Sequence, residues 1–288
     1  MGVAMNILNN VFNNREIAVF IWLVVLIGWA ASRRDVRKSF GSVLKAFLVK
    51  PIITAVGLLL FYVGGMIVLF YALELWNASH LKDTIFWLLG TAFVMLMDIN
   101  PVQRDENYFK KVLLDNTKFI LIFEFLVNFY VFELWIEIIL IPAITILGML
   151  QIVAGTKPEF KSAKTFFDIV TAIIGIVLLF FAIYNAVLNF RGFATVDTLK
   201  AFLLGPVFTA ALLPFVYMTA LFVAYEQVYI RMKIFNKDRK LVRYAMWRIL
   251  FTFHLNMGKL NRWSKRAGTL RIQSKADVRT MLTENYRP

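Results

Sequence analysis

Cysteine is absent from the 288 residues, and histidine occurs only twice, at His80 and His254. The chain therefore forms no disulfide and has neither a thiol nucleophile nor cysteine ligands for a metal. The sequence also lacks a Walker loop, a GxGxxG motif and an HExxH motif, each of which would indicate a particular cofactor or metal chemistry. We therefore expect no metal, no cofactor and no enzymatic activity.

Charged residues are scarce as well. They make up 17% of the chain against 60% hydrophobic residues, and the mean hydropathy is +0.68. An ordinary soluble domain is about 25% charged and about 45–50% apolar. A soluble fold of this size cannot hide so much apolar surface, and the excess falls in long runs, so the expected solvent is a lipid bilayer. The composition argues against a cytosolic enzyme, a disulfide-rich secreted domain and a disordered chain.

The positive charge is concentrated at one end of the chain. Residues 231–288 carry 15 basic and three acidic side chains, a net charge of +12, whereas residues 1–230 carry 17 and 15, a net charge of +2. Basic segments next to membrane spans are favoured in the cytoplasm. We therefore predict an all-α polytopic membrane protein with a transmembrane domain over residues 1–230 and a basic cytoplasmic helical region over residues 231–288.

Five apolar runs are long enough to suggest membrane crossings. A sixth run, 85–97, would rise only about 20 Å as a helix, which is short of a bilayer core of about 30 Å. The five runs are 17–31, 52–73, 119–150, 166–190 and 201–224.

The basic residues also predict the orientation. The segment 33–50 holds six Lys and Arg residues directly after the first run, so we expect the N-terminus outside and both this segment and the tail inside. That requires an odd number of crossings, and two arrangements give five. In one, 85–97 does not cross. In the other it crosses, and 119–150 enters the membrane and returns to the same side, which places 28 rather than 24 of the 32 basic residues inside. Against this re-entrant arrangement, 119–150 shows no Gly/Asn turn at its middle and could instead be one long tilted helix, so both remain open.

The fourth run carries a stripe of small and polar residues at helical spacing, within an arc of about 100°. It has two interpretations. Small and polar residues permit close helix packing. The same stripe in an oligomer would line a conduction path, with polar rings at Asp168, Asn185 and Asn189 and an apolar constriction at Leu178. The stripe comprises Asp168, Thr171, Gly175, Leu178, Ala182, Asn185 and Asn189.

Four polar residues interrupt the third run: Glu124, Asn128, Glu133 and Glu137. A charged side chain at mid-bilayer costs about 2.5–3.5 kcal/mol on insertion scales, so such groups usually face protein or water. No Lys or Arg lies within the run to pair with them. The glutamates either lie near a membrane surface, or bond to neighbouring helices as neutral acids, or form an acidic vestibule that attracts cations, or take part in a proton relay.

The basic tail is expected to contain a helix over residues 237–259, with an apolar row at every fourth position. Arg239, Lys240 and Arg243 cluster on one side of it. This surface either contacts anionic lipid, at about 1 kcal/mol per basic residue, or holds an anionic nucleotide or oligonucleotide, with Trp247 and Trp263 available for base stacking. The anion-binding candidates are Arg239, Lys240, Arg243, Arg248, Lys259 and Arg262.

The combination of a polytopic body, polar groups in the membrane runs and a basic tail from Arg231 resembles the channel-type membrane effectors of Hailong anti-phage defence systems. The resemblance is one of architecture over the whole chain. It implies a homo-oligomeric ion channel in the bacterial inner membrane, opened by an oligonucleotide signal from a companion nucleotidyltransferase.

Three functions therefore stand at this point. The leading one is an oligomeric ion channel gated through its cytoplasmic tail. The second is a membrane scaffold or accessory subunit that anchors a cytosolic partner through the same tail. The third is a secondary transporter, which is disfavoured because the two halves of the chain show no internal repeat.

Overall fold

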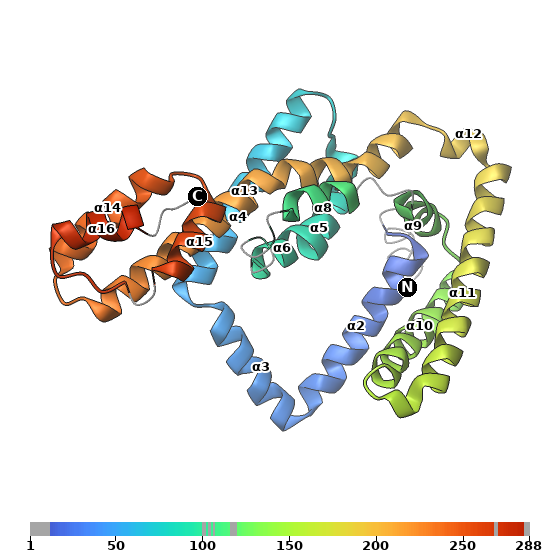
Figure 1. The fold of residues 1–288 in the computed structure, drawn as a ribbon. Coiled ribbons are helices and arrows are strands. Elements are labelled where there is room, and N and C mark those ends of the chain that lie inside the picture. Colours follow the sequence, from blue (N-terminus) through green and yellow to red (C-terminus); the bar gives the residue numbers. More distant parts are fainter. Residues whose placement is uncertain are drawn as a thin grey trace. The chain divides into compact units, whose positions relative to one another are not determined.

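The computed structural model describes residues 12–99, 102, 105, 107–115, 120–267 and 270–284, and every regular element in these ranges is a helix (Figure 1). The chain divides into two compact units. Unit 1 comprises Met1–Ile53 and Lys118–Phe202, and unit 2 comprises Thr54–Thr117 and Leu203–Pro288.

Seven described helices belong to unit 1. They are α2 (Asn14–Ser32), α3 (Arg34–Phe47), α9 (Ile120–Phe129), α10 (Leu134–Ala154), the 3₁₀ helix η3 (Pro158–Phe160), α11 (Lys161–Leu188) and α12 (Phe190–Phe193).

Ten described helices belong wholly or mostly to unit 2. Two of them, α4 and α13, begin in unit 1 and run into unit 2. The ten are α4 (Lys50–Ala72), the 3₁₀ helix η1 (Ala78–His80), α5 (Leu81–Trp87), the π-helical turn η2 (Leu88–Ala92), α6 (Phe93–Met97), α8 (Tyr108–Asp115), α13 (Val196–Phe235), α14 (Arg239–Phe253), α15 (Met257–Arg266) and α16 (Lys275–Glu284).

Six helical stretches in the described part of the chain are long and apolar enough to cross a membrane, which indicates an integral membrane protein. They are Asn14–Ser32, Lys50–Ala72, Ala78–Met97, Leu134–Ala154, Pro158–Leu188 and Val196–Phe235. The expected all-helical membrane class is therefore confirmed.

Two of the predicted runs differ from the helices that form. The run 85–97 belongs to a 20-residue helical stretch that begins at Ala78, because polar residues such as Lys82 and Asp83 join the helix ahead of the apolar ones. The run 119–150 is two helices, since the backbone leaves helical geometry from Tyr130 to Glu133. Of the two possibilities left open for this run, one long continuous helix is therefore wrong.

In unit 1, α2 begins at a capping box. The Asn13 side chain accepts the Glu16 N–H at 2.9 Å, and the Glu16 carboxylate accepts the Asn13 N–H at 2.8 Å. α2 packs along α10, and the Trp22 indole N–H donates to the Ile138 carbonyl at 2.8 Å. α11 in turn packs against both α9 and α10.

In unit 2, one apolar core extends through α4, α5, α6, α13 and the tail helices α14, α15 and α16. The ring of Phe208 on α13 stacks on Phe70 of α4 and meets Trp87 of α5 edge-on, both with centroids 5.1 Å apart. The Trp87 indole N–H donates to the Thr209 hydroxyl at 3.0 Å. The predicted boundary at residue 230/231 therefore falls inside α13 and inside one packed unit.

The tail forms three helices where the sequence predicted one over 237–259. Asp238 caps α14 by accepting the N–H groups of Lys240 and Leu241 at 2.8 and 3.2 Å, and the helix ends at Phe253. His254 follows with a positive φ of 47°, which turns the chain into α15. The expected apolar row is buried on both sides of this turn, at Ala245, Ile249, Phe253 and Met257.

Candidate functional site

A cleft between α13 and α14 of unit 2 combines basic and aromatic side chains. Its volume is about 410 Å³, within the range of pockets that hold small organic ligands. The lining residues are Tyr225 and Tyr229 from α13 and Arg239, Arg243, Met246, Trp247 and Leu250 from α14.

Helical spacing explains why these side chains converge. Arg239, Arg243 and Trp247 follow one another at four-residue intervals, which places them on one face of α14. Tyr225 and Tyr229 are likewise one turn apart on α13. Among the described residues, neither arginine has an acidic partner, and the Trp247 side chain is 56% exposed. The face thus offers two uncompensated guanidinium groups beside accessible aromatic rings.

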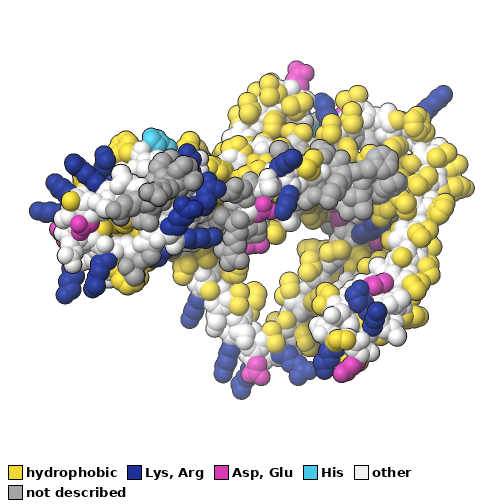
Figure 2. Space-filling model, in the orientation of Figure 1, with side chains coloured by type: hydrophobic (Ala, Val, Ile, Leu, Met, Phe, Trp, Pro, Cys, Tyr) yellow, Lys and Arg dark blue, Asp and Glu magenta, His cyan; other side chains and the backbone are white. Residues whose placement is uncertain are grey.

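The structure separates the other predicted anion-binding residues from this pair. Lys240 is exposed beside Arg239 without lining the cleft, and Arg248 is about 180° around α14 from Arg239. Lys259 lines a second cavity of about 570 Å³ at the α14–α15 turn. Arg262 is exposed on α15. Lys and Arg side chains nevertheless gather densely over the region of α14–α16, as Figure 2 shows.

One predicted stacking residue is wrong. Trp263 is only 2% exposed, and its indole N–H donates to the Met281 carbonyl at 3.2 Å, so it belongs to the tail core. Sequence reasoning did not include Tyr225 and Tyr229 among the ligand-binding candidates. Their one-turn spacing at the end of an apolar run was the available signal.

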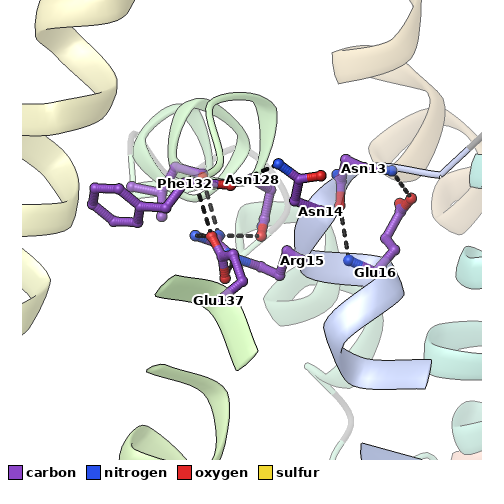
Figure 3. Close-up of polar contacts among 8 residues, drawn as sticks. Asn13, Asn14, Arg15, Glu16, Asn128, Phe132 and Glu137 are labelled. Atoms are coloured by element: carbon purple, nitrogen blue, oxygen red, sulfur yellow. Dashed lines mark hydrogen bonds and ion pairs between the residues drawn. The ribbon is translucent and has the colours of Figure 1, made fainter. Parts of the chain in front are cut away.

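In unit 1, Arg15 forms a buried ion pair with Glu137 (Figure 3). Arg15 Nη2 lies 2.9 Å from Glu137 Oε1, and Nε donates to Oε2 at 3.0 Å. Arg15 Nη1 also donates to the Val127 carbonyl at 3.0 Å and to Asn128 Oδ1 at 3.3 Å. The Glu137 side chain is fully buried, and its Oε1 accepts the Phe132 N–H at 3.0 Å.

These contacts span the interruption between α9 and α10. Arg15 binds a carbonyl in the last turn of α9 and the carboxylate in the first turn of α10, while the Asn14 amide donates to the Phe132 carbonyl at 2.9 Å (Figure 3). These bonds satisfy backbone N–H and carbonyl groups that the helix break leaves without helical partners. Such groups must be satisfied within the protein when the surroundings are apolar. The sequence of the run 119–150 does not reveal the cationic partner of Glu137, because that partner, Arg15, lies on α2, 122 residues away.

The remaining polar residues of the third run take separate positions. Glu133 is exposed and immediately precedes α10, and Asn128 is exposed apart from its bond to Arg15. The side chain of Glu124 lies outside the described residues. The four residues therefore do not belong to one helix, because the backbone is not helical from Tyr130 to Glu133.

The polar stripe of α11 contacts other helices of unit 1 at its start and near Ala182. Asp168 lies 2.8 Å from Lys164, and the Gln151 amide of α10 donates to Asp168 at 3.2 Å and to Thr171 at 3.0 Å. Near the other end, Ala182 is fully buried and clusters with Leu126 of α9. These contacts favour the helix-packing interpretation at Asp168, Thr171 and Ala182.

The middle and the last residues of the stripe make fewer contacts with neighbouring helices. A Cβ placed on Gly175 would meet no atom within 4 Å, and Leu178 is half-buried. The amides of Asn185 and Asn189 donate to carbonyls of their own helix, at 2.8 and 3.3 Å. Gly175 is therefore not needed for a close helix approach within this chain.

Among the described residues, no group of three or more His, Asp and Glu side chains is placed to hold a metal ion. The chain matches no protein-family model, no curated protein and no solved structure when compared with each.

Proposed function

We propose that the protein is a ligand-gated ion channel of the membrane, in which an anionic nucleotide or short oligonucleotide binds between α13 and α14 and opens a pore formed by several copies of the chain. The observation that carries the proposal is the cleft that joins Arg239 and Arg243 to Trp247. Guanidinium groups bind phosphates in bidentate fashion, and an exposed indole stacks on bases without sequence preference.

The position of the cleft on α13 suggests how binding reaches the membrane. α13 is one helix of 40 residues, about 60 Å long, and it carries Tyr225 and Tyr229 near its C-terminal end. Its apolar part contains Pro206 and Pro214, which remove backbone donors and favour bending. A ligand that draws α14 toward α13 would therefore act on a helix that continues into the bilayer.

The proposed pore requires an oligomer. Most side chains on the membrane helices of unit 1 are exposed, which leaves surface for further copies of the chain as well as for lipid. Symmetry would turn single polar residues into rings. A scaffold that anchors a cytosolic partner uses the same tail but conducts no ions, so current measurements distinguish the two functions.

The distribution of basic residues favours a topology with the N-terminus outside, the tail inside and five crossings, and the helix directions in unit 2 bear on which segments cross. In unit 2, the stretch η1–α6 begins beside the end of α4, where the Trp76 indole donates to the Thr84 hydroxyl. Trp87 in this stretch contacts Thr209 of α13, and Phe109, later in the chain, contacts Tyr217, which lies further along α13. This direction favours a crossing by Ala78–Met97. In unit 1, the interruption divides 119–150 into α9, with ten residues, and α10, with 21, and only α10 is long enough to cross by itself.

Reporter fusions test this topology. A reporter after Asn107 and one after Pro288 should both be cytoplasmic, whereas one before Asn6 should be external. An external signal from the Asn107 fusion would favour the arrangement in which Ala78–Met97 does not cross. An external signal from the Pro288 fusion would overturn the odd number of crossings.

Binding of a short single-stranded oligonucleotide to the detergent-solubilised protein tests the cleft. Two phosphate contacts predict a slope of about −1.4 for the logarithm of affinity against the logarithm of salt concentration. Each lost charged hydrogen bond is worth about 1.5–3 kcal/mol, so Arg243→Glu should weaken binding about 10- to 100-fold. Arg279→Glu, an exposed change on α16, serves as the control. Equal binding by the two variants would place the anion site elsewhere.

A further inference from the structure

The turn between α14 and α15 lies beside the apolar part of α13 rather than beyond its end. The Tyr225 hydroxyl donates to the His254 carbonyl at 2.7 Å, and the Tyr217 hydroxyl donates to the Leu255 carbonyl. Tyr225 directly follows the apolar run 201–224, and Tyr217 lies about 12 Å further back along the helix. The turn is therefore level with the last two turns of an apolar run.

α4 gives a second measure of this depth. Tyr62 donates to the Ala211 carbonyl at 2.8 Å, and its ring centroid lies 5.1 Å from that of Phe215. Tyr62 is about 18 Å along α4 from the first residue of that helix. The stretch of α13 just before Tyr217 thus packs against the middle of a second apolar helix.

The turn and the end of α14 present large apolar side chains outward. Phe251 is 64% exposed and Leu255 is 60% exposed, and the Phe251 ring stacks on Trp247 with centroids 5.8 Å apart. Exposed apolar side chains that gather in one place usually mark an interaction site. Phe251 and Leu255 lie at one end of a helix whose opposite end is basic.

The backbone of the turn is hydrogen-bonded in the way that lipid surroundings require. The His254 N–H donates to the Leu250 carbonyl at 2.8 Å, and the two tyrosine hydroxyls satisfy the carbonyls of His254 and Leu255. Asn256 caps α15 by accepting the Lys259 N–H at 2.9 Å. Non-helical backbone at membrane depth is tolerated where protein groups bind it.

The basic residues of α14 lie on the side away from the apolar tip, whereas Lys259 of α15 lines the cavity at the turn. Arg248 is exposed on α14, about 10 Å along the helix axis from Leu255, and Arg243 is a further turn away. Basic side chains at this offset reach the headgroup layer when the tip is in the acyl region. The charge of the helix therefore complements a surface of anionic lipid.

We propose that the α14–α15 turn is a membrane-inserted tip, with Phe251 and Leu255 in the lipid of the leaflet that holds the C-terminal end of the apolar run of α13, and Arg248 among its headgroups. The tail is then anchored in the membrane at a second point. This inference does not depend on a ligand or on ion conduction, so it can fail or hold separately from the proposed channel.

The absence of native cysteine makes the depth of this tip directly measurable. Single-cysteine variants F251C and L255C of the full chain carry a spin label in vesicles of phosphatidylcholine and phosphatidylglycerol. M218C, exposed on α13 within the apolar run, is the reference for lipid, and T283C, exposed on α16, is the reference for water. We expect both tip labels to collide with oxygen as M218C does, and with a water-soluble nickel chelate several-fold less than T283C does.

Two outcomes would overturn the proposal. Nickel collision rates at both tip labels equal to that of T283C would place the turn in water. Shielding from both oxygen and nickel would mean that protein covers the tip. Because both side chains are exposed, the labels should leave the unfolding temperature unchanged. If one label does destabilise the fold, the label at the other position decides. A second measurement is the quenching of Trp247 fluorescence by lipids that carry a quencher at a known depth, which should be lost in the F251S/L255S variant.

Discussion

Unit 2 is built around one apolar core that reaches from Leu59 on α4 to Leu282 on α16, whereas the helices of unit 1 are joined by a small apolar cluster, aromatic pairs and polar bonds. The apolar cluster in the described part of unit 1 consists of Leu126, Ala182 and Ala186. Unit 1 also contains the buried ion pair between Arg15 of α2 and Glu137 of α10. Lipid removes most of the hydrophobic drive for helix association, so polar bonds and close packing take over in a membrane. In unit 2 the apolar core continues from the long apolar helices into the basic tail helices α14, α15 and α16.

The largest expected effect is the loss of Glu137. Removing one partner of a buried ion pair costs about 3–5 kcal/mol, because the other charge remains buried and unpaired. E137A should therefore lower the yield and the unfolding temperature of the purified protein sharply, as measured by thermal unfolding in detergent. The double variant R15M/E137M should recover most of the loss. A single variant as stable as the parent would mean that unit 1 does not depend on this pair.

Variants of the two tail tryptophans, Trp247 and Trp263, test the apolar core of unit 2. Trp263 is buried in the core, so W263A should destabilise the tail by about 3–5 kcal/mol. Trp247 is exposed, so W247A should change stability far less but weaken oligonucleotide binding by about 1–3 kcal/mol. Proteolysis of the tail and a binding titration measure the two effects. Equal destabilisation by both variants would contradict the assignment of Trp247 to the ligand.

Much of the fold follows from the sequence alone. Apolar runs locate the membrane helices, and the apolar row from Leu241 onward identifies the buried face of the tail. Polar partners in space do not follow, because Arg15 and Glu137 are separated by 122 residues and neither residue indicates the other. One side of the cleft could be predicted, because the spacing of Arg239 and Arg243 is visible in the sequence. The other side could not, because packing decides which face of α13 meets these arginines.

The stripe on α11 gives a smaller effect. The bonds from Gln151 to Asp168 and Thr171 predict that D168N and Q151L each destabilise unit 1 by about 1 kcal/mol, the usual worth of such hydrogen bonds. Because Asp168 already pairs with Lys164, we expect D168N to leave the reversal potential in asymmetric salt unchanged. A shift toward anions would place Asp168 in the pore and would show that polar contacts of unit 1 also line the conduction path.

The smallest expected effect concerns pH and the exposed start of α16. The Asp277 carboxylate accepts the N–H groups of Gln273 and Ser274 at 2.7 and 2.9 Å, and these bonds lower its pKa. A lowered pKa in the folded state stabilises the fold above the unfolded-state pKa, and this contribution is lost as pH falls through the folded value. The protection of the α16 amides against hydrogen exchange, relative to the intrinsic rate at each pH, should therefore fall below about pH 4. D277N should remove this pH dependence, and an unchanged profile in D277N would assign it to another group.

Current through a planar bilayer that contains the purified protein tests the central claim most directly. We predict that a short oligonucleotide added on the side of the tail evokes a current in the parent protein and in R279E. The R239E/R243E variant, with an unchanged unfolding temperature, should require a much higher ligand concentration for the same current. A parent protein that binds the oligonucleotide in the same membrane and passes no current would contradict the channel, and the scaffold function would replace it.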